Sequence, residues 1–173
     1  MRRMQQAVTD ADEIEAILAA GQVCHLAINT GAGQAPYLVA MNFGYDYLAD
    51  SAPGGWAGSL SLWFHCALEG YKLDLIAANA QVGFQVLSSL AVISESKEAA
   101  CDWAMQYQSI VGSGVIDLVT DPSQKLYGLG RLVAHYGGSH LPFNEDSLAR
   151  SAVLQLNVDQ FSAKRSRNLL PAT

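Results

Sequence analysis

The sequence predicts a mainly β protein, a small antiparallel barrel with helices at its rim. About six segments show the alternation of apolar and polar residues that is typical of half-buried strands. Several of these segments are joined by short glycine-rich connections, as in hairpins. Only three segments have helical spacing, which is too few for the regular strand–helix alternation of a doubly wound sheet.

The N-terminal part is expected to contain one helix. Thr9 or Asp10 can cap its start, and Gly21 follows its last turn. Acidic residues in the first turn suit the positive end of the helix dipole, and one face is apolar through Ile14, Ile17 and Leu18.

A hairpin is expected after this helix. Its strands are predicted at residues 23–29 and 36–47, with a turn at residues 30–34. The turn contains Gly31 and Gly33, a spacing that also occurs in dinucleotide-binding loops. Because this turn joins two strands and no helix follows it, the pattern favours a hairpin over a nucleotide site.

The middle of the chain contains strands and loops around one short helix. A loop rich in glycine and proline at residues 50–58 leads into a strand at 59–67, and a helix is expected at 71–78. A strand at 82–87 and a charged surface loop at 94–98 complete this part.

The C-terminal part is expected to contain two strands with a helix between them. The first strand, at 105–120, is interrupted at residues 112–114, where two glycines indicate a bulge or bend. Asp121 as cap and Pro122 in the first turn open a helix that stops near Gly137 and Gly138. The last strand is expected at 152–161.

The composition indicates one domain over residues 1–173, with its core from about residue 8 to 165. Half of the residues are hydrophobic and only 15% are charged, so we expect part of the apolar surface to lie at a subunit interface. The net charge is −6, and the one basic cluster lies at residues 164–167. Nucleic acid is therefore not an expected partner.

The cysteines and histidines point to no disulfide framework and no metal site. Cys24, Cys66 and Cys101 are odd in number and form no CxxC pair, a usage typical of the cytoplasm. His135 and His140 lack metal-ligand spacing, so no metal is expected. Neither a signal-peptide pattern nor an apolar run of about 18 residues occurs, so no membrane association is expected.

The most informative stretch is residues 64–76, where a predicted strand passes through a short turn into a helix. The first amides of a helix have no partner within it and carry partial positive charge, so a phosphate is stabilised there. Lys72, in the first turn, adds a full positive charge, and His65 and Cys66 at the strand end would face the group that carries the phosphate. The stretch is a candidate phosphate site, although a lysine at such a position is more often only solvated.

Three motifs in sequence order resemble a known family. They are N-F-G-Y at residues 42–45, F-H-x-A-x-x-G-x-K at 64–72, and Y-x-S-x-x-G-x-G at 107–114. Their order and spacing resemble the pyridoxamine 5'-phosphate oxidase-like FMN-binding split barrels, and more narrowly the nitroimidazole-resistance (Nim) branch, over about residues 1–165. The resemblance implies a six-stranded FMN-binding split barrel that forms a homodimer, with one FMN per subunit in a cleft at the interface.

The resemblance also implies a set of cofactor-binding residues. Backbone groups of the strand at residues 39–42 would edge the isoalloxazine ring, a lysine would hold the phosphate, and two residues would contribute from the neighbouring strand. The histidine would be the catalytic residue, which donates a proton to the substrate. The set is Val39, Ala40, Met41, Asn42, His65, Cys66, Lys72, Gln108 and Ser109.

The implied function is an FMN-dependent oxidoreductase that reduces small aromatic or nitro compounds, with a nicotinamide donor that binds transiently. One alternative is a non-catalytic flavin or haem binder in which His65 is an axial ligand. A second alternative is a pyridoxamine-phosphate oxidase-like enzyme. Such an enzyme would be expected to carry a basic signature for the substrate phosphate near its C-terminus, which residues 164–167 resemble only loosely. The last alternative is a pseudo-enzyme that keeps the barrel for dimerisation and has lost the cofactor.

Overall fold

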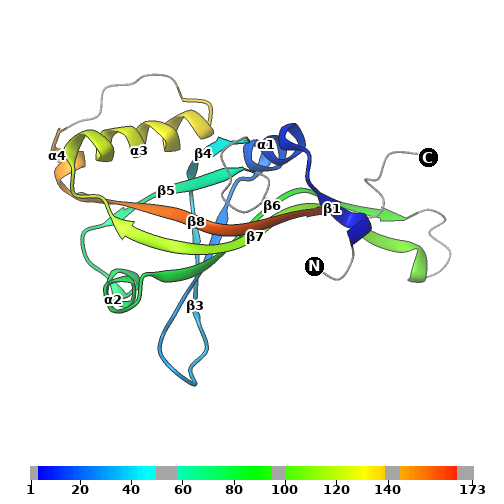
Figure 1. Cartoon of the computed structure of the whole chain (residues 1–173), viewed down its shortest axis with the longest axis horizontal. Coiled ribbons are helices and arrows are strands. Elements are labelled where there is room, and N and C mark those ends of the chain that lie inside the picture. The colour runs from blue at the N-terminus through cyan, green and yellow to red at the C-terminus, as the bar shows by residue number, and fades with distance from the viewer. Residues whose placement is uncertain (1–3, 50–57, 95–99, 139–144, 167–173) are drawn as a thin grey trace.

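A computed structural model describes residues 4–49, 58–94, 100–138 and 145–166, and it confirms the mainly β fold (Figure 1). The described strands form one antiparallel sheet. They are β1 (Ala7–Val8), β2 (Cys24–Ile28), β3 (Tyr37–Met41), β4 (Gly44–Leu48), β5 (Ser59–Ala67), β6 (Gln81–Ser94), β7 (Trp103–Leu118) and β8 (Ser151–Arg165). The helices are α1 (Ala11–Ala20), α2 (Tyr71–Ala78), α3 (Pro122–His135) and α4 (Glu145–Ala149), with 3-10 turns at Met4–Gln6 and Ala100–Asp102.

The sheet is an open barrel whose two edges are neighbours in the sequence. Its strand order is β3-β2-β6-β7-β8-β5-β4, and β1 pairs with β8. The edge strands β3 and β4 are joined only by Asn42 and Phe43, so the sheet must curl until its two edges meet at this link. The expected single strand at 36–47 is therefore wrong at its middle, and its division, together with β1, accounts for eight strands where six were expected.

Three further strands differ from their predicted bounds, since β7 covers Trp103–Leu118 instead of 105–120 and β8 covers Ser151–Arg165 instead of 152–161. β6 extends to Ser94, well beyond the predicted end at residue 87, and its pairing with β7 is irregular after Ser88. The expected irregularity at residues 112–114 is confirmed, since the β7–β8 register shifts between Ser113 and Gly114. The extra residue, Asp159, belongs to β8. Residues 50–57 and 95–98, which form most of the loops expected at 50–58 and 94–98, lie outside the described residues.

The three predicted helices are confirmed, with the caps that the sequence indicates. The Asp10 carboxylate accepts a hydrogen bond from the Glu13 amide at 3.0 Å at the start of α1. The Asp121 carboxylate accepts one from the Gln124 amide at 2.8 Å at the start of α3. Gly137, at φ +79°, ends α3 in the left-handed conformation that glycine adopts most easily. No described helix is both long and apolar enough to cross a membrane.

Two apolar clusters hold these elements together. The larger fills the barrel and includes the buried face of α1, formed by Ile14, Ile17 and Leu18 as predicted. The smaller lies on the outside of the barrel under α3 and consists of Trp63, Leu129, Leu132 and Val153. In Figure 1, α3 accordingly lies along β5 and β8, on the side of the sheet opposite α2.

Glycines let α3 approach the sheet closely. A Cβ atom at Gly44 would lie 2.4 Å from the backbone of Arg131, and one at Gly128 would lie 2.4 Å from the Trp63 ring. Side chains at these two positions would push the helix away from β4 and β5. The close packing matters for function because α3 also forms one wall of the candidate site.

Candidate functional site

The start of α2 has the geometry of an anion site. Gly70 precedes the helix at φ +143° and ψ 157°, a conformation that favours glycine, and no side chain caps the helix. The Gly70 carbonyl accepts from the amides of Leu73 and Asp74 at 2.8 and 3.3 Å. These two amides are thus bonded within the helix, whereas the amides of Tyr71 and Lys72 before them have no side-chain cap.

Lys72 connects this helix to the edge strand β3. Its Nζ atom lies 3.6 Å from the Met41 Sδ atom, and its side chain is half-buried. A thioether is only a weak acceptor, so this contact leaves most of the hydrogen-bonding capacity of the ammonium group for a ligand. The structure thus brings together two of the predicted residues from segments about thirty positions apart.

His65 and Cys66 lie at the end of β5, within the electrostatic reach of Lys72. Partial desolvation, followed by the positive charge of Lys72, lowers the pKa of His65 below its ordinary value, so the imidazole is neutral at pH 7. Desolvation raises the pKa of the Cys66 thiol, and Lys72 offsets this only in part. Cys66 is therefore a neutral thiol at pH 7 and is not activated as a nucleophile.

His65 and Asn42 line one open cavity of about 420 Å³. The remaining wall comes from the C-terminal part of α3 and the glycines after it, through Leu132, Val133, Tyr136 and Gly138. None of the site residues predicted from the sequence lies in α3. The available signal was an apolar helix face that ends in a tyrosine directly before Gly137, but only the packing of α3 on β4 and β5 brings it to the site.

The predicted residues of β3 lie on an edge of the sheet. Val39 and Ala40 pair with Leu26 and His25 of β2, and β3 ends the described strand order. The backbone groups on its other side are not used by a strand ladder, so they can bind a planar ligand at the edge.

Gln108 and Ser109 lie elsewhere in the subunit. Their strand, β7, pairs with β6 and β8 and is separated from β3 by β2 and β6. Gln108 accepts a hydrogen bond from the Ser89 hydroxyl at 2.8 Å. The Ser109 hydroxyl is buried and has no hydrogen-bond partner among the described residues. Their role at the cofactor stays a prediction.

A carboxylate on β4 holds α3 in place. The Asp46 carboxylate accepts hydrogen bonds from Trp63 Nε1 and the Tyr127 hydroxyl, each at 2.7 Å, and pairs with Arg131 Nε at 2.9 Å. Arg131 also donates to the Tyr45 carbonyl oxygen from Nε at 2.9 Å and from Nη2 at 2.5 Å. Since the Trp63 side chain is buried, its N–H group needs this acceptor.

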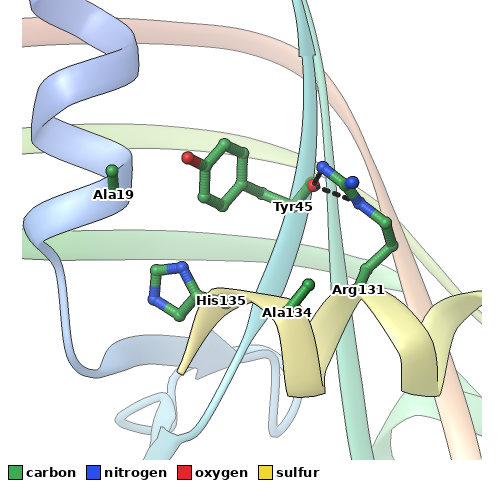
Figure 2. A pocket seen from close by; sticks show the side chains of 5 residues that line it. All are labelled: Ala19, Tyr45, Arg131, Ala134 and His135. Atoms are coloured by element: carbon green, nitrogen blue, oxygen red, sulfur yellow. Dashed lines mark hydrogen bonds between the residues drawn. The ribbon is translucent and has the colours of Figure 1, made fainter. Parts of the chain in front are cut away.

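A second, smaller cavity of about 200 Å³ lies between α1 and α3 (Figure 2). The Tyr45 ring points from β4 towards Ala19, while Arg131 lies on the other side of the strand and bonds to the Tyr45 backbone. His135 closes the cavity, and its Nε2 atom lies 2.7 Å from the Gly21 carbonyl oxygen. The polar groups that line this cavity therefore already have partners within the protein. The start of α2, in contrast, has no side-chain cap.

Solved structures with a similar fold come from several bacteria. A candidate 5-nitroimidazole antibiotic resistance protein from Bacteroides thetaiotaomicron has a TM-score of 0.72 and 23% identity, covering 92% of this chain and 86% of that one. The flavocytochrome Anf3 from Azotobacter vinelandii has a TM-score of 0.68 and 17% identity, covering 96% and 72%. An FAD- and haem-binding protein from Mycobacterium smegmatis has a TM-score of 0.69 and 17% identity, covering 97% and 77%. At these identities the likeness establishes the fold alone.

Sequence comparison adds the family. No curated protein gives a match. The family model described as pyridoxamine 5'-phosphate oxidase matches residues 10–165, which include the edge strand β3, the end of β5, the start of α2 and the wall formed by α3. The expected relationship is confirmed: the chain belongs to the pyridoxamine 5'-phosphate oxidase family.

Proposed function

We propose that the protein is an FMN-binding flavoprotein, a cytoplasmic homodimeric oxidoreductase that reduces small aromatic or nitro compounds. The observation that carries this proposal is the start of α2, where uncapped amides and Lys72 stand next to the edge strand β3. Family membership and the flavin named for two of the similar structures support it. A nicotinamide donor would bind transiently, because the sequence contains no dinucleotide-binding fingerprint.

The residues present fit the phosphate end of FMN. A phosphate dianion needs amide donors and a cation, and the start of α2 offers both. Gly70 leaves room for the approach, since a Cβ atom there would have no neighbour within 4 Å. Asp74, in the same turn, opposes an anion, so the net attraction depends on Lys72.

The residues also fit the ring end. Val39, Ala40 and Met41 would supply backbone donors and acceptors from an edge strand, and Asn42 would supply them from the link that follows it. Bound flavin would supply the electron transfer, and the protein positions the ring and sets its electrostatic surroundings.

His65 would serve as the proton donor at the cavity. The charge of Lys72 contributes to its low pKa, so a phosphate dianion paired with Lys72 would raise that pKa towards its ordinary value. The cofactor would then bring His65 into the range where an imidazole exchanges protons near neutral pH. Cys66 would only pack beside the ribityl chain, because its thiol is protonated.

A second copy of the chain would complete the site. The paired positions Val111, Gln85, His25 and Ala40 run across β7, β6, β2 and β3 on one face of the sheet. Leu38 follows the same alternation and is 67% exposed. This face is the one that we expect a partner subunit to cover.

Three measurements test this proposal. The purified protein should show flavin absorption bands, or acquire them with FMN in preference to FAD, and it should oxidise a nicotinamide donor in the presence of a nitroaromatic compound. Light scattering should give the mass of a dimer, and Leu38→Glu should shift it towards the monomer. A colourless protein that does not bind added FMN would exclude the proposal.

Haem binding is the second candidate function. His65 offers a neutral imidazole beside a cavity with an apolar wall, which is the form that coordinates iron. Haem is named for one of the similar structures, and another is called a flavocytochrome. A Soret band that is lost in His65→Ala would support this candidate over the flavin reductase.

A pyridoxamine-phosphate oxidase-like activity receives less support. A substrate phosphate would need cations in addition to Lys72, and the C-terminal basic cluster is their expected source. In the described part of that cluster, Arg165 forms an ion pair with Glu13, and Lys164 Nζ lies 5.3 Å from the centre of the Tyr107 ring.

A further inference from the structure

Tyr136 joins α3 to two separate backbone segments near the site. Its hydroxyl donates a hydrogen bond to the Gln22 carbonyl oxygen at 2.8 Å and accepts one from the Phe43 amide at 3.1 Å. Gln22 lies just before β2, and Phe43 lies in the link between β3 and β4. One phenol thus connects the helix to the link at which the two edges of the sheet meet.

The link between β3 and β4 takes no part in the strand ladders. The last ladder pair of β3 is Met41 with Cys24, and the first pair of β4 is Gly44 with Trp63. Asn42 and Phe43 lie between these pairs, so their backbone groups need partners outside the strand ladders. For the Phe43 amide, this partner is the Tyr136 hydroxyl.

We propose that Tyr136 is a positioning residue that holds the Asn42 side chain in the cavity opposite His65. Asn42 and His65 line the same cavity, with Tyr136 in its wall. On one side of Asn42, Met41 contacts Lys72; on the other side, Phe43 is fixed by Tyr136. The inference rests on the proposed function, in which Asn42 contacts the flavin through its backbone, and it adds a contact from the Asn42 side chain.

The raised pKa of Tyr136 keeps its hydroxyl protonated in the neutral range. Desolvation is the main cause of the increase, and the hydrogen bond from Phe43 partly opposes it. The group can therefore donate to Gln22 and accept from Phe43 at the same time.

A merely stabilising role is the competing explanation, and Tyr127 provides the matched control. Tyr127 lies on α3, which ends just before Tyr136, and its hydroxyl donates to Asp46 at 2.7 Å, away from the residues that line the cavity. Tyr136→Phe and Tyr127→Phe remove the same atom, and each leaves its aromatic ring in place. Only the first removes the partner of the Phe43 amide.

The first measurement is amide hydrogen exchange with NMR signals of the link, on the protein without added flavin. Loss of one hydrogen bond should increase exchange at Phe43 about tenfold in Tyr136→Phe and shift the Asn42 side-chain amide signals. Tyr127→Phe should leave both unchanged. Unchanged exchange at Phe43 in Tyr136→Phe, or an equal increase in Tyr127→Phe, would overturn the proposal.

The second measurement is FMN affinity in a double-mutant cycle with Asn42→Ala. Tyr136→Phe alone should weaken binding about threefold to tenfold, and it should have little further effect once the Asn42 side chain is absent. Additive effects would show that Tyr136 does not act through Asn42. If the wild-type protein binds no FMN, the proposed function fails, whereas the exchange at Phe43 and the Asn42 signals still decide the positioning role.

Discussion

The helices α2 and α3 flank the same site but differ in how their polar groups are used. α3 has a side-chain cap from Asp121, and Lys125 Nζ donates to the Leu148 carbonyl oxygen at 2.5 Å. Tyr127 and Arg131 of α3 bond to Asp46. α2 has no side-chain cap, and its Lys72 has a thioether as partner.

The polar groups of α3 thus stabilise the fold, whereas those at the start of α2 remain available to bind a ligand. Polar groups near a protein's interior normally find partners within the protein, so a helix start and an ammonium group without strong ones stand out. The same comparison explains why the cavity between α1 and α3 is a poor candidate, although it contains an arginine and a histidine. The predictions below test this distinction.

The largest effect is expected from removing the acceptor that holds α3. Asp46→Ala leaves the buried Trp63 N–H unpaired and should lower the free energy of unfolding by about 2–4 kcal/mol. The ion pair with Arg131 adds little, because both side chains are partly exposed. Urea denaturation measures the change, and Asp117→Ala, an exposed carboxylate on β7, is the control. Equal losses in the two variants would contradict the role of Asp46.

The next effect falls on binding and not on stability. Lys72→Ala should weaken FMN affinity by about 1.5–3 kcal/mol, the contribution of a charge-assisted hydrogen bond, with little change in unfolding. Lys125→Ala removes the same group from α3. It should lower stability and leave FMN affinity unchanged, because the Lys125 amine donates to the Leu148 carbonyl oxygen. Fluorescence titration with FMN and urea denaturation measure both properties. Full retention of affinity in Lys72→Ala would show that the phosphate binds elsewhere.

Alanine at a glycine should have opposite effects in the two helices. A Cβ atom at Gly70 or at Gly130 would have no neighbour within 4 Å, so backbone conformation decides the result. Gly70→Ala is strained at φ +143° and should cost about 1–2 kcal/mol. Gly130→Ala, inside α3, should stabilise by about 0.5–1 kcal/mol. Thermal unfolding measures both signs, and stabilisation by Gly70→Ala would contradict the described turn.

The smallest effect concerns the titration of His65. Desolvation and then Lys72 lower its pKa, so Lys72→Ala should raise that pKa without restoring the ordinary value. FMN bound at Lys72 should also raise it, since the phosphate offsets the same charge. NMR titration of the imidazole protons measures the midpoint, and Lys125→Ala should leave it where it is in the wild type. A midpoint insensitive to Lys72→Ala would place the two groups too far apart to interact.

The sequence was sufficient for features that depend on neighbours along the chain. The bounds of α2 and β5 agree with the prediction, because Gly70 and the apolar alternation of residues 59–67 are local signals. The break at Asn42 and Phe43 was missed, since both residues continue the strand pattern and only closure of the sheet requires it. The wall formed by Leu132, Val133 and Tyr136 was missed for a similar reason: it depends on where α3 packs.

The strand order also has a consequence for how the chain is made. In the sheet, β8 lies between β7 and β5 and pairs with both of them. It is also the last of these strands in the sequence, so β5 and β7 remain unpaired on those edges until β8 has been synthesised. Exposed strand edges recruit other chains, and a nascent chain that stalls before Ser151 would therefore be prone to aggregation even though most of its apolar core has been synthesised.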